Sequence, residues 1–310
     1  MKELTIISGK GGTGKTTITG SFGVLARSKV LVDCDVDASD LYLILEPEVQ
    51  SKEGFFGSQK ALVDEEKCIK CGLCEDNCRF DAIVDLKINE MRCEGCGTCA
   101  YVCPEGAITL KPEKTGELFV SETRCGTMVH ARLGIGAENS GRLVAHVRQK
   151  ALEVAKAKDE ELVIIDGAPG VGCSVIASIS GVDMVLIVTE PTFSGLSDME
   201  RAVDLCTHFG IETLVCINKY DLNKENVKEI ERFCYENGIE VVGRIPYDPD
   251  VTKAMVNAKT LVEYSQNTAA QSLIEIWKRI VERMSLSKSR PAKDVECLCI
   301  DEVHHADDYF

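Results

Sequence analysis

Residues 9–17 read Gly9-Lys10-Gly11-Gly12-Thr13-Gly14-Lys15-Thr16-Thr17. This loop follows a short apolar run, Leu4–Ile7, and precedes a helical pattern that extends from Lys15 to about Arg27. A glycine-rich loop between a strand and a helix is the context of a phosphate-binding loop, whose backbone N–H groups and helix N-terminus surround nucleotide phosphates. In such a loop Lys15 would reach the β- and γ-phosphate oxygens, and the hydroxyl of Thr16 would bind Mg²⁺.

Further apolar runs predict the sheet to which this loop belongs. Val30–Val32 follows the first helical pattern, and four later runs are each separated from the next by a plausible helix. The four are Leu162–Ile165, Met184–Thr189, Leu214–Ile217 and Glu240–Ile245. Apolar β-branched runs that alternate with helices indicate an α/β fold with a mostly parallel sheet, covered on both faces. We also expect a helical, charged stretch from about Ser121, centred on Gly141–Lys158, and a last helix over about Leu261–Met284.

A cysteine-rich segment, Val63–Ile108, interrupts this pattern and contains an internal repeat. The copies are Cys68-Ile-Lys-Cys71-Gly-Leu-Cys74-Glu-Asp-Asn-Cys78 and Cys93-Glu-Gly-Cys96-Gly-Thr-Cys99-Ala-Tyr-Val-Cys103. The spacing is that of bacterial ferredoxins, in which three cysteines of one copy bind a [4Fe–4S] cluster and the fourth binds the other cluster. We therefore predict that Cys68, Cys71, Cys74 and Cys103 bind one cluster, and that Cys93, Cys96, Cys99 and Cys78 bind the second. Zinc is the alternative, although zinc sites favour paired C-x₂-C motifs separated by a longer loop.

The composition changes abruptly after about Ser58, and the change divides the chain into domains. We predict a discontinuous P-loop domain formed by residues 1–58 and 114–285, with a small α+β bacterial-ferredoxin-like domain inserted at 59–113. A module of this size is too small for a self-sufficient core, so its clusters are expected to stabilise it. The polar, acidic tail 286–310 is expected to be disordered.

The charge and cysteine content exclude several classes of protein. A net charge of −15 argues against a nucleic-acid-binding surface and against a basic patch that would anchor the chain stably to a membrane. No apolar run is long enough to span a bilayer, and the N-terminus leads straight into the glycine loop rather than forming a signal peptide. We therefore expect a cytoplasmic protein whose 16 cysteines are reduced and available as metal ligands.

The lysine at the start of the loop gives the loop a family resemblance. With Lys10, the sequence resembles the deviant Walker A motif of the MinD, Mrp and nitrogenase-iron-protein superfamily of P-loop ATPases. In that family this lysine reaches the nucleotide of a second copy, so the resemblance implies Mg²⁺-dependent ATP hydrolysis by a homodimer with an ATP-sandwich interface. Asp35 in Asp33-Cys34-Asp35 then corresponds to the carboxylate that orients the attacking water, and Asp166 to an aspartate near Mg²⁺. Either aspartate could instead be a helix cap.

The resemblance also extends to the base end of the site. Asn218-Lys219 resembles the adenine-reading loop, and Ile245-Pro246-Tyr247-Asp248 resembles a second base contact. The implied catalytic residues are Lys10, Lys15, Asp35 and Asp166. The expected nucleotide-binding residues are Gly9, Lys10, Gly11, Gly12, Thr13, Gly14, Lys15, Thr16, Thr17, Asn218, Lys219, Pro246 and Tyr247.

Several cysteines lie outside the repeat. Cys173, seven residues after Asp166, resembles the cysteine of the nitrogenase iron protein that holds a cluster between two subunits, and Cys125 is a candidate second ligand. The alternative is that Cys173 is a small buried residue. Cys297 and Cys299, near His304 and His305, either bind a metal or belong to an unstructured end. The remaining cysteines are expected in the core: Cys34, Cys206, Cys216 and Cys234.

The chain as a whole resembles a MinD-superfamily ATPase with an inserted domain that carries two [4Fe–4S] clusters. The first hypothesis is an accessory ATPase in iron–sulfur or metallocofactor assembly, acting on a client protein. The second is an ATP-gated reductase that passes electrons to a redox partner. The third is a non-enzymatic switch whose nucleotide and redox state governs partner binding.

Overall fold

The computed structural model describes residues 1–36, 39–134 and 140–285. The tail 286–310, with Cys297 and Cys299, lies outside the described residues, and so do the predictions made for it. Contacts divide the chain into a larger unit, which includes Met1–Lys52, Phe119–Ala131 and the chain from Ser140, and a smaller unit, formed by Glu53–Leu118 and a segment that begins at Arg132. The smaller unit thus contains the whole of the predicted insert, 59–113, and several more residues on each side.

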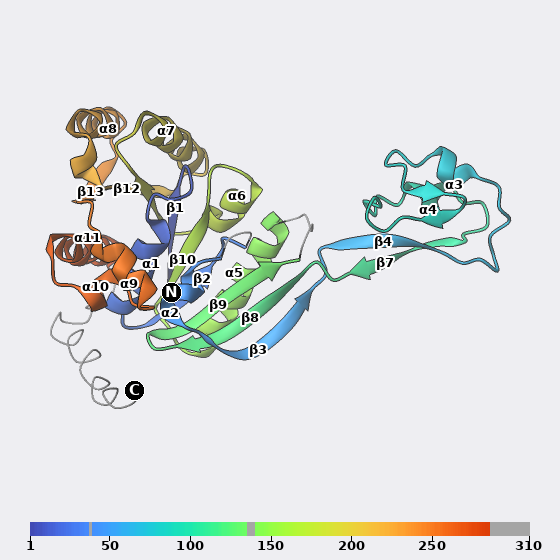
Figure 1. The fold of residues 1–310 in the computed structure, drawn as a ribbon, viewed down its shortest axis with the longest axis horizontal. Helices are drawn as coiled ribbons and strands as arrows, with labels where there is room; N and C mark the ends of the chain where they lie inside the picture. Colours follow the sequence, from blue (N-terminus) through green and yellow to red (C-terminus); the bar gives the residue numbers. More distant parts are fainter. Residues whose placement is uncertain (37–38, 135–139, 286–310) are drawn as a thin grey trace, which may run out of the picture. The chain divides into compact units, whose positions relative to one another are not determined.

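The larger unit is organised around a sheet with the strand order β13-β12-β11-β1-β10-β2-β9-β8-β3 (Figure 1). Strands β1, β2, β10, β11, β12 and β13 span Lys2–Ser8, Lys29–Asp33, Leu162–Pro169, Met184–Thr189, Glu212–Asn218 and Glu240–Ile245. Neighbours among these six strands pair in parallel. Each strand contains one of the predicted apolar runs, so the mostly parallel sheet is confirmed. Because the strands run in one direction, their carboxyl ends meet at one edge, where α/β sheets place ligands.

Three further strands extend the sheet beyond β2: β9 (Gly126–Leu133), β8 (Gly116–Thr123) and β3 (Glu48–Phe55). The predicted helical stretch from about Ser121 is therefore wrong as far as Leu133, and helix α5 occupies only Ser140–Ala157. These strands were missed because they mix polar and apolar residues and are not buried on both faces. The first seven residues of β3 are all exposed. Continuous apolar runs mark only strands that helices cover on both sides.

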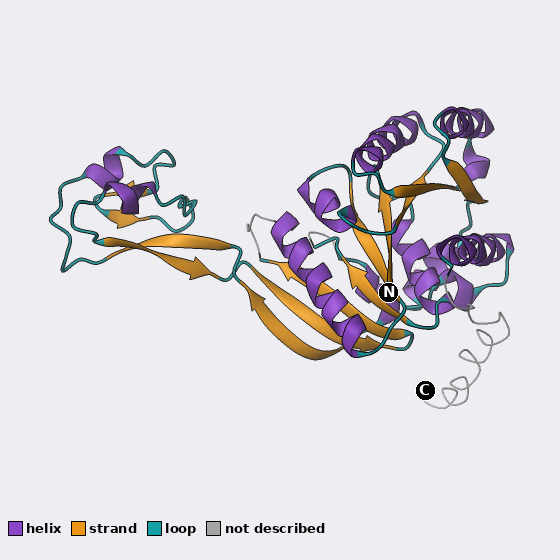
Figure 2. Ribbon diagram, turned by 180° about the vertical axis from the view of Figure 1, so that it is seen from behind, coloured by secondary structure: helices purple, strands orange, loops and turns teal. Residues whose placement is uncertain are grey.

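Helices cover both faces of the parallel strands (Figures 1 and 2). One layer contains α1 (Lys15–Leu25), α2 (Leu41–Leu45), α10 (Leu261–Tyr264) and α11 (Thr268–Met284), which contact one another, and α9 (Asp250–Val256), which contacts α10. The other layer contains α5, α6 (Cys173–Ile179), α7 (Phe193–His208) and α8 (Lys224–Glu236). The short η1 (Tyr220–Leu222) precedes α8. In the first layer the rings of Phe22 and Trp277 lie 5.1 Å apart, and both are buried.

The predicted last helix, Leu261–Met284, is two helices in the structure. Helix α10 ends at Tyr264, and α11 begins after Asn267, whose side chain accepts a hydrogen bond from the N–H of Ala270. This is an N-cap, which satisfies a helix donor that would otherwise lack a partner. Among the helices of residues 1–36, 39–134 and 140–285, none is both long and apolar enough to cross a membrane.

Between Ser58 and Glu113, all of which the structure describes, the smaller unit contains two antiparallel strand pairs and two short helices. Strand β4 (Ser58–Val63) pairs with β7 (Ile108–Glu113), and β5 (Ile83–Val84) pairs with β6 (Lys87–Ile88). The helices are α3 (Leu73–Asp76) and α4 (Thr98–Val102). Each helix follows a glycine with a left-handed backbone, Gly72 (φ 80°) and Gly97 (φ 81°), a conformation that glycine adopts without steric cost.

The sequence repeat appears as a structural repeat within the smaller unit. The N–H of Asp64 donates to the carbonyl oxygen of Ala107 at 2.7 Å. At the positions that correspond in the repeat, 25 residues away, the N–H of Asn89 donates to the carbonyl oxygen of Ala82, also at 2.7 Å. Each copy therefore hydrogen-bonds to the other copy at matching positions. A small cluster of buried apolar residues contains Ala61, Ala82, Cys93 and Ile108.

Candidate functional site

The glycine loop joins β1 to α1 at the carboxyl edge of the parallel strands. Gly12 and Gly14 have left-handed backbones, with φ of 79° and 90°. A Cβ at Gly14 would come within 2.4 Å of Nδ2 of Asn218, which itself donates to Thr13 O at 2.7 Å. Glycine is thus required at position 14 both by backbone conformation and by the close approach of the loop that follows β12.

A cavity of about 630 Å³ lies beside this loop, a volume within the range of small-molecule sites. Most of the predicted nucleotide residues line it: Gly11, Gly12, Thr13, Gly14, Lys15, Thr16, Thr17, Asn218, Lys219, Pro246 and Tyr247. Asp35 also lines it, whereas Gly9, Lys10 and Asp166 do not. Residues from the first helix layer, including Val251, Leu261 and Leu273, form an apolar wall. The fold thus gathers phosphate-binding and base-binding candidates from opposite ends of the chain into one cavity.

Lys15 is buried and lies between two carboxylates. Its Nζ is 3.0 Å from Oδ1 of Asp166 and 3.9 Å from Oδ2 of Asp35. Burial alone would lower the pKa of Lys15, but the carboxylates of Asp166 and Asp35 outweigh it and raise that pKa, so the ammonium stays charged. The structure therefore brings together three of the four residues predicted to be catalytic.

Two buried polar atoms near Lys15 have no hydrogen-bond partner among the described residues: Oδ2 of Asp166 and Oγ1 of Thr13. A buried polar atom without a partner costs free energy, and such atoms commonly mark sites that bind an ion, a water molecule or a ligand. Oδ1 of Asp166 is already used, because Lys15 and Thr19 both donate to it. The remaining oxygen is suited to a cation or to a metal-bound water, so these residues fit a bound nucleotide with Mg²⁺.

Asp33, at the end of β2, is a buried carboxyl to which the sequence analysis gave no role. It accepts hydrogen bonds from Ser39 Oγ at 2.6 Å, from Asp35 N–H at 3.0 Å and from Leu41 N–H at 3.2 Å. Burial and the nearby Asp166 raise the pKa of Asp33 to about 7. These hydrogen bonds show Asp33 holding the segment that carries Asp35, which is a positioning role.

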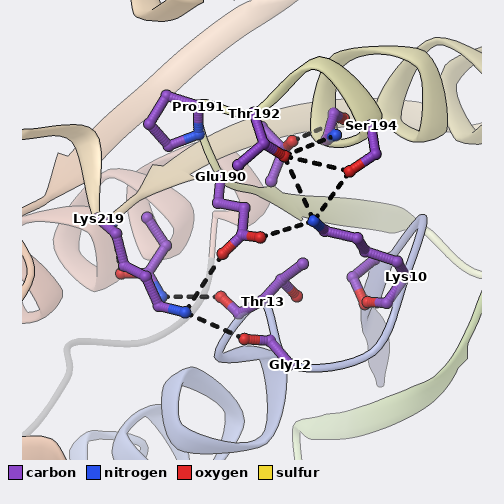
Figure 3. Close-up of polar contacts among 12 residues, drawn as sticks. Lys10, Gly12, Thr13, Glu190, Pro191, Thr192, Ser194 and Lys219 are labelled. Carbon is purple, nitrogen blue, oxygen red and sulfur yellow. Dashed lines mark hydrogen bonds and ion pairs between the residues drawn. The ribbon is translucent and has the colours of Figure 1, made fainter. Parts of the chain in front are cut away.

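Lys10 lies beside the cavity but turns toward the residues that follow β11 (Figure 3). Its Nζ is 2.7 Å from Oε1 of Glu190, 3.1 Å from Ser194 Oγ and 3.3 Å from Thr192 Oγ1. Lys219 approaches the same carboxylate, with 3.2 Å between Nζ and Oε2 of Glu190. Burial would raise the pKa of Glu190, but the hydrogen bonds and charges of Lys10 and Lys219 keep it below its usual value. Sequence reasoning missed Glu190; its only signal is its position directly after a buried parallel strand.

The eight repeat cysteines line two cavities in the smaller unit, four in each. One cavity is lined by Cys68, Cys71, Cys74 and Cys103, together with apolar residues such as Val63 and Ile108. The other is lined by Cys78, Cys93, Cys96 and Cys99, together with Ala61, Phe80 and Leu110. Each copy of the repeat thus contributes three cysteines to one cavity and one to the other, which is the grouping that crossed ligation requires. Such a donor set fits a [4Fe–4S] cluster, whose ligands are four cysteine thiolates.

Cys78 and Cys103, the fourth cysteine of each copy, lie in the cavity of the other copy and accept equivalent hydrogen bonds. The N–H of Ala82 donates to Cys78 Sγ, and the N–H of Ala107 donates to Cys103 Sγ, both at 3.3 Å. N–H donors to sulfur are the kind of contact that tunes cluster potentials. Across the described ranges, no group of three or more histidine, cysteine, aspartate or glutamate side chains is arranged around a single metal ion.

The structure does not bring Cys173 and Cys125 together. Cys173 is exposed at the start of α6, beyond the carboxyl end of β10, so the interpretation of Cys173 as a buried residue is wrong. Cys125 is buried, and its carbonyl accepts a hydrogen bond from Lys29, the first residue of β2. Because β2 and β10 are parallel, the two cysteines lie at opposite ends of the sheet. The four cysteines predicted for the core are all buried: Cys34, Cys206, Cys216 and Cys234.

Residues 4–262 match the family model described as the CobQ/CobB/MinD/ParA nucleotide binding domain. The chain belongs to this family. An uncharacterized protein of Methanocaldococcus jannaschii is 34% identical to it over 285 residues, which are 90% of this chain and 96% of that protein. The iron-sulfur cluster carrier protein of Pyrococcus abyssi is 24% identical over 168 residues, which are 50% of this chain and 56% of that protein.

Solved structures show that the CobQ/CobB/MinD/ParA domain of this chain has the MinD fold. The septum site-determining protein MinD of Pyrococcus horikoshii, solved in complex with Mg-ADP, aligns with a TM-score of 0.57 and 18% identity. The alignment covers 91% of this chain and 97% of that chain. At this identity the likeness establishes the fold alone, and the α/β P-loop prediction is confirmed.

Proposed function

We propose that the protein binds ATP with Mg²⁺ in the cavity beside the glycine loop and hydrolyses it. The observation that carries this proposal is the arrangement around Lys15, whose ammonium lies between Asp166 and Asp35, while one oxygen of Asp166 has no hydrogen-bond partner in the part of the chain that the structure describes. The Mg-ADP held by MinD of Pyrococcus horikoshii supports the same ligand class here. Phosphoryl transfer needs charge neutralisation and positioning more than covalent chemistry, and these groups suit both tasks.

The residues divide the work as follows. Lys15 would neutralise charge on the β- and γ-phosphates, and the Thr16 hydroxyl and Asp166 would hold Mg²⁺ or its water ligands. Mg²⁺, when bound, neutralises charge on the phosphate oxygens. Asp35 lines the cavity and orients the attacking water. Asn218 and Lys219, with Pro246 and Tyr247, contact the base.

The functional form is a homodimer in which each Lys10 reaches the nucleotide of the other copy. Lys10 does not line the cavity of its own chain. Phe193, which lies between the two hydroxyl residues that contact Lys10, has 86% of its surface exposed. A large apolar side chain that is exposed between two residues contacting Lys10 is suited to burial against a second copy.

The smaller unit is proposed to be a ferredoxin-like domain with two [4Fe–4S] clusters, held by Cys68, Cys71, Cys74 and Cys103 and by Cys93, Cys96, Cys99 and Cys78. The support is the four-cysteine lining of each cavity. When bound, each cluster supplies one-electron redox chemistry. The protein chain contributes the thiolates, the N–H donors to sulfur and the apolar walls.

The coupled role we favour is that of an accessory ATPase in iron–sulfur or metallocofactor assembly. The likeness to the iron-sulfur cluster carrier protein of Pyrococcus abyssi supports it. A labile cluster would have to bind outside the two cavities, and the exposed Cys173, near the end of β10, is the candidate ligand. With Cys125 buried, a bridging cluster would need other ligands from the second copy.

Electron transfer to a partner protein is the second candidate. It is favoured by the complete set of four cysteines at each cavity, because full thiolate ligation retains a cluster rather than releasing it. ATP binding would then control when the partner docks and receives electrons.

Iron content and ATP hydrolysis, measured on the same preparations, test the proposal. We expect about eight irons per chain after anaerobic reconstitution, as two cubanes require. Lys15→Met should lower ATP turnover by roughly 10³-fold or more, because it removes the main phosphate ligand, while leaving the eight irons in place. The matched control is Lys2→Met, at an exposed lysine paired with Asp183 at the start of β1, the end of that strand opposite the glycine loop, and it should hydrolyse ATP normally.

The same preparations separate the two roles. In assembly, iron above eight per chain would be present, would disappear in Cys173→Ala, and would pass to an apo iron–sulfur enzyme only with ATP. In electron transfer, the iron would stay at eight, and ATP would instead speed oxidation of the reduced protein by an acceptor. Normal ATP turnover by Lys15→Met would contradict the ATPase proposal itself.

A further inference from the structure

Glu190 connects the two ends of the proposed nucleotide site. It directly follows β11, and its carboxylate is shared, with Oε1 2.7 Å from Nζ of Lys10 and Oε2 3.2 Å from Nζ of Lys219 (Figure 3). Lys10 begins the glycine loop, whereas Lys219 follows β12 and also donates to Gly12 O at 3.2 Å. One side chain therefore joins the start of the phosphate loop to the loop assigned to the base.

The ammonium group of Lys10 is fully engaged within its own chain. A lysine has three N–H donors, and Nζ of Lys10 has three acceptors within 3.3 Å: Glu190, Thr192 and Ser194. In this arrangement no donor remains for a phosphate of another molecule. Lys10 can reach a second nucleotide only by giving up these contacts, and the strongest of them is the charge-assisted bond to Glu190.

We propose that Glu190 is a positioning residue that holds Lys10 inside its own subunit and releases it only when two nucleotide-bound copies associate. The inference rests on the proposed function, in which Lys10 acts on the nucleotide of a second copy. The holding contact keeps the lysine away from its own cavity and opposes premature dimerisation.

The burial of the pair makes the contact energetically relevant. The side chain of Glu190 is 15% exposed and that of Lys10 is 30% exposed, so solvent screens the pair less than it screens a surface ion pair. Lys219 shares the carboxylate, so release of Lys10 leaves Glu190 with a cation rather than as an unpaired buried charge. Because Lys219 remains paired with Glu190, Lys10 can leave this carboxylate at a modest cost in free energy.

The test is the protein concentration at which MgATP-bound chains form dimers, measured by analytical ultracentrifugation on the full, cluster-loaded protein. Glu190→Gln should weaken the hold on Lys10 and lower the dimer dissociation constant. An ion pair of this kind corresponds to about two- to fivefold per subunit, and a symmetric dimer releases two, so we expect about four- to 25-fold.

Further variants separate the two branches of the contact. Ser194→Ala removes an acceptor of Lys10 without touching Lys219, and should shift dimerisation in the same direction by a smaller factor; it also serves if Glu190→Gln does not fold. Lys219→Met removes the other branch, and should weaken nucleotide binding without lowering the dimer dissociation constant. Glu212→Gln, at an exposed pair with Arg283 at the start of β12, which is the end of the sheet opposite the glycine loop, is the matched control and should dimerise like the wild type.

The outcomes distinguish this inference from the proposed function. If Glu190→Gln and Ser194→Ala need as much protein as the wild type, or more, while Lys10→Ala fails to dimerise, Glu190 does not hold Lys10 back and only the inference is overturned. If Lys10→Ala dimerises and hydrolyses ATP normally, the role of Lys10 in the proposed function is wrong, and the inference falls with it.

Discussion

The two units of this chain are stabilised by different means. The larger unit packs two layers of helices on a parallel sheet, and its core includes large, fully buried side chains such as Phe22, Leu31 and Met128. In the smaller unit the cluster of buried apolar residues beside the repeat cysteines is formed by small or medium-sized side chains, Ala61, Ala82, Cys93 and Ile108, against which other repeat cysteines pack. A core this small cannot offset the conformational entropy lost when the segment becomes ordered.

The difference indicates how much bound ligands contribute to the folding of each unit. In the larger unit the apolar core forms the fold, and the cavity beside the glycine loop lies at the carboxyl edge of the sheet. In the smaller unit the cysteines are both part of the core and the proposed ligands, so binding free energy is also folding free energy. The larger unit should therefore keep its fold when emptied, and the smaller unit should not.

The largest expected effect follows removal of iron. Anaerobic chelation should raise amide hydrogen exchange in β4 and β7 by about 10³-fold or more, because structural metal sites contribute several kcal/mol to folding. Exchange in β1 and β10 should stay slow. Hydrogen-exchange mass spectrometry measures both regions in one sample. Protected β4 and β7 after complete iron loss would mean that the smaller unit does not need its clusters.

The reverse experiment weakens the larger unit alone. Phe22→Ala removes a fully buried ring that packs 5.1 Å from the ring of Trp277, and should lower the free energy of unfolding of this unit by about 3–5 kcal/mol. Denaturant unfolding followed by tryptophan fluorescence reports on it directly, since Trp277 is the single tryptophan of the chain. The visible absorbance of the proposed iron–sulfur clusters should remain at the wild-type level at denaturant concentrations below the unfolding transition. Loss of the clusters in folded Phe22→Ala would show that the two units are not independent.

The sequence predicts part of the fold and part of the candidate site. The parallel strands and the glycine loop were predictable because strands covered on both faces are continuous apolar runs and the loop is contiguous in sequence. Strands β3, β8 and β9 were not, since they mix polar with apolar residues along their length. Glu190 was missed for a different reason: its role depends on β11 lying next to β1, which brings residues 180 positions apart into contact.

The smallest expected effect, taken per pH unit, is a pH dependence of the stability of the larger unit. The pKa of Asp33 rises from 3.8 in the unfolded chain to about 7 in the fold, so between these values the folded protein binds more protons than the unfolded one. Stability from this group is therefore present at low pH and is lost as pH rises from about 4 to 7, by at most roughly 1.4 kcal/mol per pH unit. Asparagine does not titrate, so the free energy of unfolding of Asp33→Asn should rise relative to that of the wild type between about pH 4 and 7. Denaturant unfolding without nucleotide measures this difference. A constant difference between the two proteins would contradict the raised pKa.

Strand β3 forms one edge of the nine-stranded sheet. Its exposed polar residues bear on whether the protein aggregates at high concentration. An open edge offers unpaired backbone groups to any strand of another molecule, which is a common route to aggregation. Over Glu48–Gly54 every residue of β3 is exposed, and the stretch includes Glu48, Lys52 and Glu53. Charges at an edge make the approach of a second strand costly. The polar composition that hid this strand from sequence prediction is thus also expected to oppose fibrillar self-association of the protein.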